Sequence, residues 1–299
     1  MDHRTTLRSL TIACLFPTLG TALHAQDKSA SGHLLNWTNT IVVETDSLVN
    51  GRYKLPAHTF TVWEADPGTA LNALKAAYAE QGAKFSGSSP LRGMATVAGM
   101  GEAPVLLLAT TAKDKKAGGA RMQVAFAAND STALPSGGEA AHALAVQVNR
   151  AIVQQQIDAQ QKIVDKHHGR LEGAQKDQAK AQEKAGKAAE DLEKAKKEKS
   201  RLTDKHTQLQ KEELKLKERY NATQEAKDLE KLTKMHNKLV KVQEDLAKQI
   251  RKEADAQESH NKRQGAIPEA QEAQQGHQVS KEQAVSELEA LKRKLEAVR

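Results

Sequence analysis

The chain has one cysteine among its 299 residues, Cys14, which lies inside a short apolar run. We expect Cys14 to be removed with that run, which leaves no thiol. The absence of thiols excludes disulfide bonds, thiolate metal sites and a cysteine nucleophile. Long hydrophobic runs are also scarce. The apolar stretch from Leu10 to Leu23 is too short to cross roughly 30 Å of hydrocarbon, and no later segment approaches a spanning length.

The amino terminus is typical of a signal peptide. Arg4 and Arg8 precede the apolar run, which ends in small residues before a polar start. Small residues at this place give a signal peptidase access to the backbone. We therefore expect residues 1–25 to be a signal peptide that is cleaved after Ala25. The protein is then exported, to the periplasm or the extracellular space, with no transmembrane span in the mature chain.

Aromatic residues make up only 3% of the chain and gather before residue 140. Beyond the signal peptide they are Trp37, Tyr53, Phe60, Trp63, Tyr78, Phe85 and Phe126, followed only by Tyr220. Large side chains build a core, so we predict a folded head at 33–138. The rest, 139–299, is rich in Ala, Gln, Leu and charge. It cannot close a globular core but can form long helices that bury a narrow stripe.

Charges of both signs mark the tail. From residue 150 onward it holds 33 Lys and Arg against 27 Asp and Glu. Its densest basic clusters, 194–197 and 292–294, are flanked by glutamates. Nucleic-acid binders concentrate basic residues without matching acids. The pattern therefore indicates solvated helix faces with pairs four residues apart, and it argues against a nucleic-acid partner.

The head alternates strand and helix patterns. Asp66-Pro67 opens a helix, because Asp is a good N-cap and Pro suits the first turn, and Gly82 is placed to end it. Short glycine turns between the later runs imply an antiparallel meander. Strands are expected at residues 41–43, 58–64, 93–98, 105–111 and 121–128. The order ββαβββα predicts an α+β class, with a small two-layer antiparallel-sheet head that is ferredoxin-like or related.

The tail follows a heptad pattern in two registers, which predicts a long α-helical coiled coil. The registers slip between Tyr220 and Leu232. The slip is explained either by a stutter in one continuous helix or by a hairpin turn near Asn221, which the similar arm lengths favour. Gly265 to Pro268 should kink or end the helix, and because the heptad phase continues across these residues we expect a kink. Much of one seam is alanine, which buries little area, so we expect a weak seam.

Four histidines, His167, His206, His260 and His277, fall on seam positions. A hairpin would bring His206 near His236 and His167 near His277. Such imidazole pairs could bind a metal or weaken the seam when protonated below about pH 6.5. The alternative is chance placement in a long tail. Spacing supplies no third ligand, so we predict no metal site and no cofactor.

Catalytic chemistry is not indicated. Asp46, Glu64, Asp66 and Glu102 could form a carboxylate pair, but capping explains Asp66. The glycines at 99–101 and 118–119 lack the Lys-Ser/Thr of a phosphate loop. We predict no catalytic residues and no enzymatic activity.

Three stretches of the head are HTFTVWEADPGTALNALKAAYAEQGAK (His58–Lys84), VAGMGEAPVLL (Val97–Leu107) and MQVAFAAND (Met122–Asp130). In these the chain resembles a group of uncharacterised exported bacterial proteins that join a small α/β domain to a coiled coil. The resemblance implies that architecture and carries no activity. The organisation also resembles small periplasmic holdase chaperones, which are basic and have helical prongs on a β body. Here, however, a complete head precedes the coil.

These features lead us to expect a non-enzymatic structural or scaffolding protein of the cell envelope. Its tail would self-associate or dock to another helical protein, so an oligomer is possible. The alternatives are a periplasmic holdase-type chaperone or cargo-binding protein, and a head that binds a small ligand.

Overall fold

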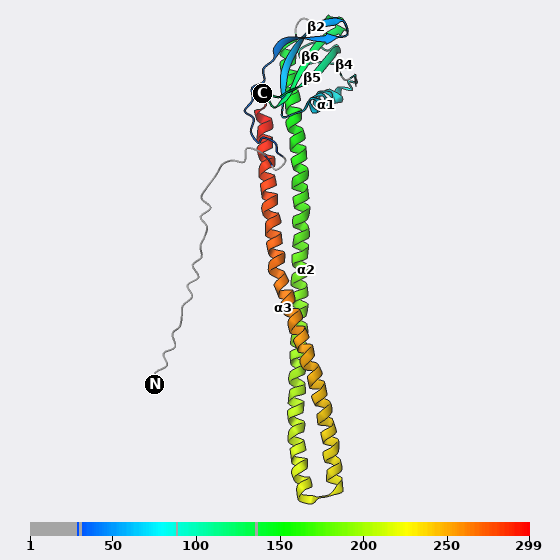
Figure 1. Ribbon diagram of the computed structural model, residues 1–299, viewed down its shortest axis with the longest axis vertical. Helices are drawn as coiled ribbons and strands as arrows, with labels where there is room; N and C mark the ends of the chain where they lie inside the picture. The colour runs from blue at the N-terminus through cyan, green and yellow to red at the C-terminus, as the bar shows by residue number, and fades with distance from the viewer. Residues whose placement is uncertain (1–28, 30–31, 88, 135–136) are drawn as a thin grey trace, which may run out of the picture. The chain divides into compact units, whose positions relative to one another are not determined.

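The computed structural model describes residues 29, 32–87, 89–134 and 137–299, and it is α+β (Figure 1). The expected signal peptide, 1–25, and Cys14 lie outside the described residues. Two compact units make up the chain. We call them the head, which comprises the described residues up to Val153 together with Arg293–Arg299, and the hairpin, Gln154–Lys292. The head therefore extends beyond the expected boundary at 138, and it includes the carboxy-terminal residues.

One antiparallel sheet forms the head. Its order is β1-β2-β6-β5-β4-β3, with β7 paired to β6, and each pairing is antiparallel. The strands are β1 Glu44–Asn50, β2 Tyr53–Trp63, β3 Phe85–Ser86, β4 Leu91–Ala95, β5 Val105–Asp114, β6 Gly119–Asn129 and β7 Thr132–Ala133. The expected meander of β4, β5 and β6 is present. The connectivity differs from the βαββαβ pattern of a ferredoxin-like sheet, because only one helix links strands of this sheet.

The first two strands differ from the sequence-based expectation. Residues 41–43 form no strand, although they are the most apolar part of that segment. The strand is Glu44–Asn50, and β2 begins at Tyr53, five residues earlier than expected. A tight turn at Gly51, with φ of 61°, joins them. Pairing along the whole length of the two strands outweighs the low strand propensity of Asp, Ser and Asn in β1.

The helix α1 spans Pro67–Ala77 and begins as predicted. Asp66 is its N-cap, and its Oδ1 accepts the amide hydrogens of Gly68 at 2.8 Å and Thr69 at 3.0 Å. The α-helix ends before the predicted stop, and the short 3₁₀ turn η1, Ala79–Gln81, leads to Gly82 in the left-handed region. Three residues of α1, Ala70, Ala73 and Leu74, are fully buried against the sheet.

The sheet has a core on each face. Phe60 and Val62 of β2 point to the face opposite Leu55 and Ala57, because side chains alternate along a strand. The second face holds a small buried cluster of Leu48, Leu55, Ala57, Leu108 and Ala125.

Hydrogen bonds join β1 to β4 and to the turn after β6. Asn50 of β1 is buried and accepts a hydrogen bond from Arg92 of β4. Its amide also donates to the carbonyl of Asp130 at 2.9 Å, in the turn after β6. Strands β1 and β4 are separated by three strands in the sheet order, so these contacts require the sheet to curl strongly.

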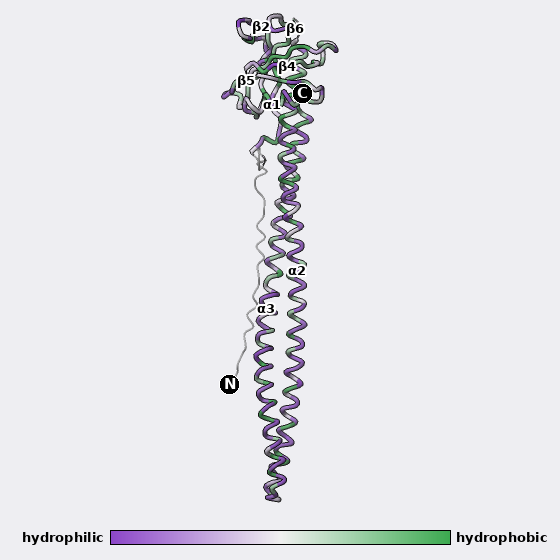
Figure 2. The backbone as a smooth tube through the Cα atoms, turned by 90° about the vertical axis from the view of Figure 1, so that its right-hand side faces the viewer, coloured by the Kyte–Doolittle hydropathy of each residue, from purple (hydrophilic) through white to green (hydrophobic). Residues whose placement is uncertain are grey.

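Two long helices complete the chain, α2 Gly138–Thr223 and α3 Ala226–Ala297. In the head, the first turns of α2 pack on the sheet, and Asn149 bonds to the backbone of Thr61 and Trp63 in β2. In Figure 2 the helices are mostly hydrophilic, with apolar positions recurring along them. The arm of α2 within the hairpin, 154–223, is roughly 105 Å long at 1.5 Å per residue.

The two helices of the hairpin are antiparallel and are joined at Gln224 and Glu225, three residues after Asn221 (Figure 1). The register slip therefore corresponds to a turn and not to a stutter. The helix does not end at 265–268, since α3 continues through Gly265 and Pro268. Proline removes one backbone hydrogen bond, and the turns on either side keep theirs.

Candidate functional site

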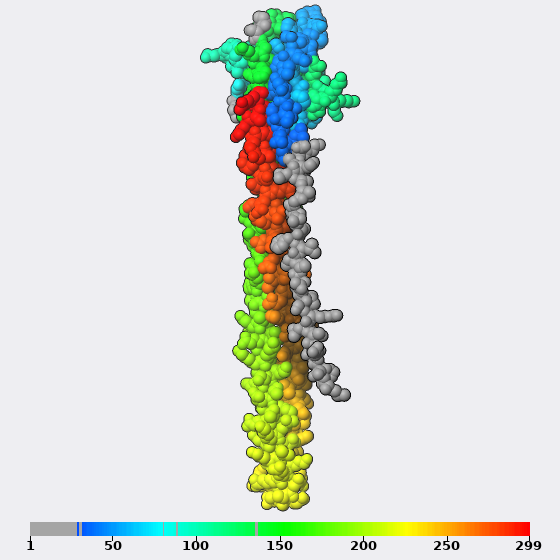
Figure 3. Space-filling model, turned by 90° about the vertical axis from the view of Figure 1, so that its left-hand side faces the viewer, coloured from blue at the N-terminus to red at the C-terminus, as the bar shows by residue number. Residues whose placement is uncertain are grey.

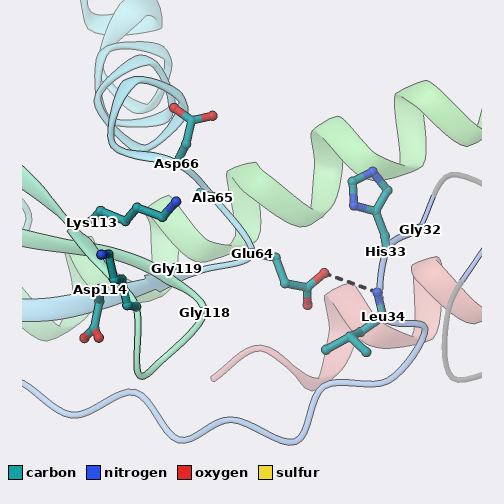
Figure 4. A pocket seen from close by; sticks show the side chains of 11 residues that line it. Gly32, His33, Leu34, Glu64, Ala65, Asp66, Lys113, Asp114, Gly118 and Gly119 are labelled. Atoms are coloured by element: carbon teal, nitrogen blue, oxygen red, sulfur yellow. Dashed lines mark hydrogen bonds between the residues drawn. The ribbon is translucent and has the colours of Figure 1, made fainter.

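The head contains a pocket of about 730 Å³ (Figure 4). Three segments form it: the strap at 32–34, the link between β2 and α1, and the β5–β6 turn. Its lining residues are Gly32, His33, Leu34, Glu64, Ala65, Asp66, Lys113, Asp114, Lys115, Gly118 and Gly119. It brings together two of the carboxylates considered from the sequence, Glu64 and Asp66.

Two of the acids in this pocket stabilise turns. Asp66 caps α1 and also accepts the hydroxyl of Thr69 at 2.7 Å. The hydrogen bonds from the Thr69 hydroxyl and amide hold the pKa of Asp66 below its ordinary value. Asp114 accepts the amide hydrogens of Lys116 and Ala117, each at 3.0 Å. These carboxylates have structural partners already, which accounts for them without a catalytic role.

The third acid, Glu64, belongs to a buried ionic clasp. Its Oε1 lies 2.7 Å from the Nζ of Lys294, whose side chain is 0% exposed. Lys294 also donates to the carbonyl of Leu34 at 2.7 Å, and the amide of Leu34 donates to Glu64 at 3.3 Å (Figure 4). Figure 3 shows the red carboxy-terminal end of α3 against the blue amino-terminal segment. The clasp therefore joins the strap, the end of β2 and the end of α3.

The clasp was missed by sequence reasoning, which placed Lys294 in a solvated basic cluster. One signal could have identified it. Lys294 stands three residues after Leu291 and four before Val298, and both are fully buried. That spacing places Lys294 on the apolar face of the helix. Its neighbour Lys292 behaves as expected, because it pairs with Glu289 on the surface at 2.8 Å.

The other two carboxylates lie elsewhere. The carboxylate of Asp46, on β1, accepts hydrogen bonds from the hydroxyl of Thr59 at 3.0 Å and from the side-chain amide of Gln123 at 2.6 Å. The amide of Ser47 and these two side chains hold its pKa below the ordinary value. Glu102 lies between β4 and β5 and is exposed.

Polar contacts define the pairing of the hairpin helices. Gln160 is fully buried and donates to the carbonyl of Ala284 at 3.1 Å and to Glu287 at 3.2 Å. Further out, Gln249 donates to the carbonyl of Ala195 at 3.0 Å. A buried polar residue of this kind disfavours other registers, because a shift leaves it without its partner.

Burial changes along the hairpin. The end nearest residues 154 and 292 buries Ile157 and Leu171 on α2 and Leu288 and Leu291 on α3. Along residues 193–223, all of which the structure describes, α2 buries no side chain. Six apolar heptad residues there are half-buried, namely Leu202, Leu209, Leu216 and Tyr220 on α2 and Leu232 and Met235 on α3. Two others on α3, Leu239 and Val242, are buried.

Asp228 stabilises the turn of the hairpin. Its carboxylate accepts hydrogen bonds from the side chains of Arg219 at 3.0 Å, Thr223 at 3.1 Å and Lys231 at 3.3 Å. Burial acts to raise the pKa of Asp228. The hydrogen bonds from Lys231 and Thr223 and the nearby charges outweigh it, so the pKa lies below its ordinary value of 3.8.

The four seam histidines are half-buried, as their heptad positions predict. His167, His206 and His260 each have one buried ring nitrogen without a hydrogen-bond partner. The predicted pairing of His206 with His236 is not seen, because His236 is largely exposed and its Nδ1 lies 2.8 Å from Glu213. Among the described residues, no group of three or more His, Cys, Asp or Glu could hold a metal ion.

Comparison with known proteins finds no family model that matches the chain and no match among curated proteins. In the part of the chain that the structure describes, no helix has the length and apolar character needed to cross a membrane.

Proposed function

We propose that this is a non-enzymatic structural or scaffolding protein of the cell envelope, and that its hairpin acts by coiled-coil association with a second helical hairpin or helix. The supporting observation is the half-buried heptad stripe beyond Leu192. Six of the apolar side chains at seam spacing there are left partly in water by the two helices of one chain, whereas Leu239 and Val242 of α3 are buried. Further helices packed on this stripe would remove more apolar surface from water, which favours association.

The location in the envelope rests on the amino-terminal sequence. The basic residues Arg4 and Arg8, the apolar run and the small residues before Gln26 favour export. A mature chain without cysteine suits an oxidising compartment.

A shortened hairpin tests the proposed function. Ala195 and Gln249 lie opposite each other, so replacing residues 196–248 by a short glycine-containing turn removes the distal hairpin and keeps the rest in register. We expect the intact chain to form a defined complex, with itself or with one envelope protein, and the shortened chain to lose it. Melting of the head, followed by tryptophan fluorescence, should not change. Equal association of the two proteins would refute the proposal.

A holdase-type chaperone is the second candidate, and the structure contains one feature that favours it. The head includes Arg293–Arg299, so the hairpin is inserted within the head instead of following it. All seven strands still precede the hairpin, but the return of the chain to the head makes the organisation more like that of the chaperones. The test is aggregation of an unfolded outer-membrane β-barrel protein, with and without the intact chain. Suppression at equimolar ratio that is lost on shortening the hairpin would support this candidate, and unchanged aggregation would exclude it.

A further inference from the structure

A shallow groove of about 600 Å³ lies near the turn of the hairpin, on one side of both helices. Leu214 and Leu232 provide its apolar surface. The polar lining residues are Gln210, Glu213, Lys217, Thr233 and His236. Leu214 is 59% exposed.

The apolar surface extends beyond the groove along α3. Leu229, Thr233, His236 and Val240 recur at intervals of four, three and four residues, so they share one side of the helix. Because Thr233 and His236 line the groove, Leu229 and Val240 lie on the groove side too. They are 45% and 39% exposed. We call Leu214, Leu229, Leu232 and Val240 the tip patch.

We propose that the tip patch is the docking surface for a second copy of this chain, with two hairpin tips packing across a two-fold axis into a four-helix bundle. This inference rests on the proposed function and names the partner. In a two-fold interface the same surface is used on both sides, so the apolar patch of one copy covers that of the other. Four-helix bundles bury apolar stripes in this way.

Charge favours a second copy over a partner of one dominant sign. The rim of the groove carries Glu213 and Lys217, four residues apart on α2, and His236 of α3. Lys217 makes no ion pair within the described residues, whereas Glu213 is bonded to His236. A surface of mixed sign can face a copy of itself with opposite charges aligned. A surface of one sign would repel its copy.

The tip patch alone is smaller than a standard interface. From the turn to Val240, α3 spans roughly 24 Å at 1.5 Å per residue, and two adjacent helices are about 20 Å wide, so the tip patch covers on the order of 500 Å². Packing along the whole of that side, over the roughly 46 Å of residues 193–223, offers on the order of 900 Å², against about 800 Å² per partner in a standard interface.

The mass of the full chain in solution tests this inference. We expect a dimer at micromolar concentration by light scattering. The double substitution Leu214→Glu and Leu229→Glu should raise the dissociation constant at least tenfold, since it sets like charges against each other in the patch. Both side chains are exposed, so helix content should not change. The matched control is Val279→Glu, which is 63% exposed but lies roughly 65 Å further along α3 from His236.

The possible outcomes separate this inference from the proposed function. A dimer that persists in the double variant would overturn docking at the tip patch and leave self-association standing. A monomer at all concentrations would overturn the inference, and the shortened hairpin then decides whether another protein is the partner. If the control dissociates equally, the effect is not specific to the patch and the inference fails.

A cross-link provides a second measurement, because we expect the mature chain to contain no cysteine. Gln210→Cys, on the rim of the groove, should give a covalent dimer with a short bis-maleimide reagent, and Val279→Cys should not. Equal cross-linking at the two positions would contradict the proposed interface.

Discussion

Replacing Lys294 by methionine should destabilise the head strongly. Methionine keeps the length and apolar stem of lysine but removes the ammonium group, which is bonded to Glu64 and to the carbonyl of Leu34. Removing one member of a buried ion pair typically costs 3–5 kcal/mol, because the partner loses its counter-charge. Glu64 is 16% exposed and can regain some water, so we expect about 3 kcal/mol, at the lower end.

Tryptophan fluorescence during urea unfolding measures this effect in the head alone. Both tryptophans, Trp37 and Trp63, belong to the head, so the hairpin adds no signal. With an m-value of about 2 kcal/mol/M, a loss of about 3 kcal/mol lowers the unfolding midpoint by about 1.5 M. Lys292→Met is the matched control. It breaks only an exposed pair and should change the free energy of unfolding by less than about 0.5 kcal/mol.

A double-mutant cycle with Glu64→Gln isolates the ion pair. If the clasp acts as described, the two substitutions together should cost clearly less than the sum of their single effects, with a coupling of at least about 1 kcal/mol. Additive effects, or a Lys294→Met variant as stable as Lys292→Met, would refute the reasoning.

The remaining predictions concern the hairpin. Gln224 adopts a φ of 57°, which favours glycine, so Gln224→Gly should raise the thermal midpoint of the hairpin by relieving about 1 kcal/mol of backbone strain, as followed by circular dichroism. Leu192→Ala should cost about 2–3 kcal/mol because Leu192 is buried, whereas Leu202→Ala at a half-buried position should cost about 1 kcal/mol; equal losses in urea titrations would contradict the burial gradient. The pKa of Asp228 is lower in the folded chain than its ordinary value, so its contribution to stability is present above about pH 4 and is lost as the pH falls through the folded pKa. Asp228→Asn should therefore lower stability at pH 7 and make the hairpin less sensitive to acid, which melting curves from pH 7 to pH 3 would measure.

The clasp also explains why the end of the chain matters to the head. Arg293–Arg299 contribute Lys294 and Val298, both buried, to a unit whose other described residues end at Val153. A fragment ending near residue 150 would lack both side chains, so experiments on the head should use the whole chain.

Helices and strands were predicted correctly where a few neighbouring residues determine them. Asp66 caps α1 and Pro67 starts it, because capping needs only adjacent backbone groups. The strands β5 and β6 were placed within a few residues by their apolar runs and glycine turns. β1 was misplaced, because its polar residues pair with β2 through backbone hydrogen bonds that depend on the turn at Gly51.

In the candidate sites, too, burial could be predicted from the sequence but contacts between distant residues could not. Heptad spacing predicted that the four seam histidines and the apolar residues of the heptad stripe beyond Leu192 are at least partly shielded from water, and the histidines are half-buried. It could not show that His236 bonds to Glu213, since side chains on two helices meet only when the turn residue is known. The exposure of Leu214 and Leu229 also follows from the observed turn and pairing.

By itself, the sequence determined that an aromatic, strand-forming segment precedes a long charged helical region, because periodicity and composition act along the chain. Only the tertiary structure decided which distant residues meet. It closed the helices into a hairpin at Gln224, curled the sheet so that Asn50 reaches Arg92, and buried Lys294 against Glu64. Each of these contacts joins residues far apart in the chain, and its free energy depends on burial and geometry that no local pattern contains.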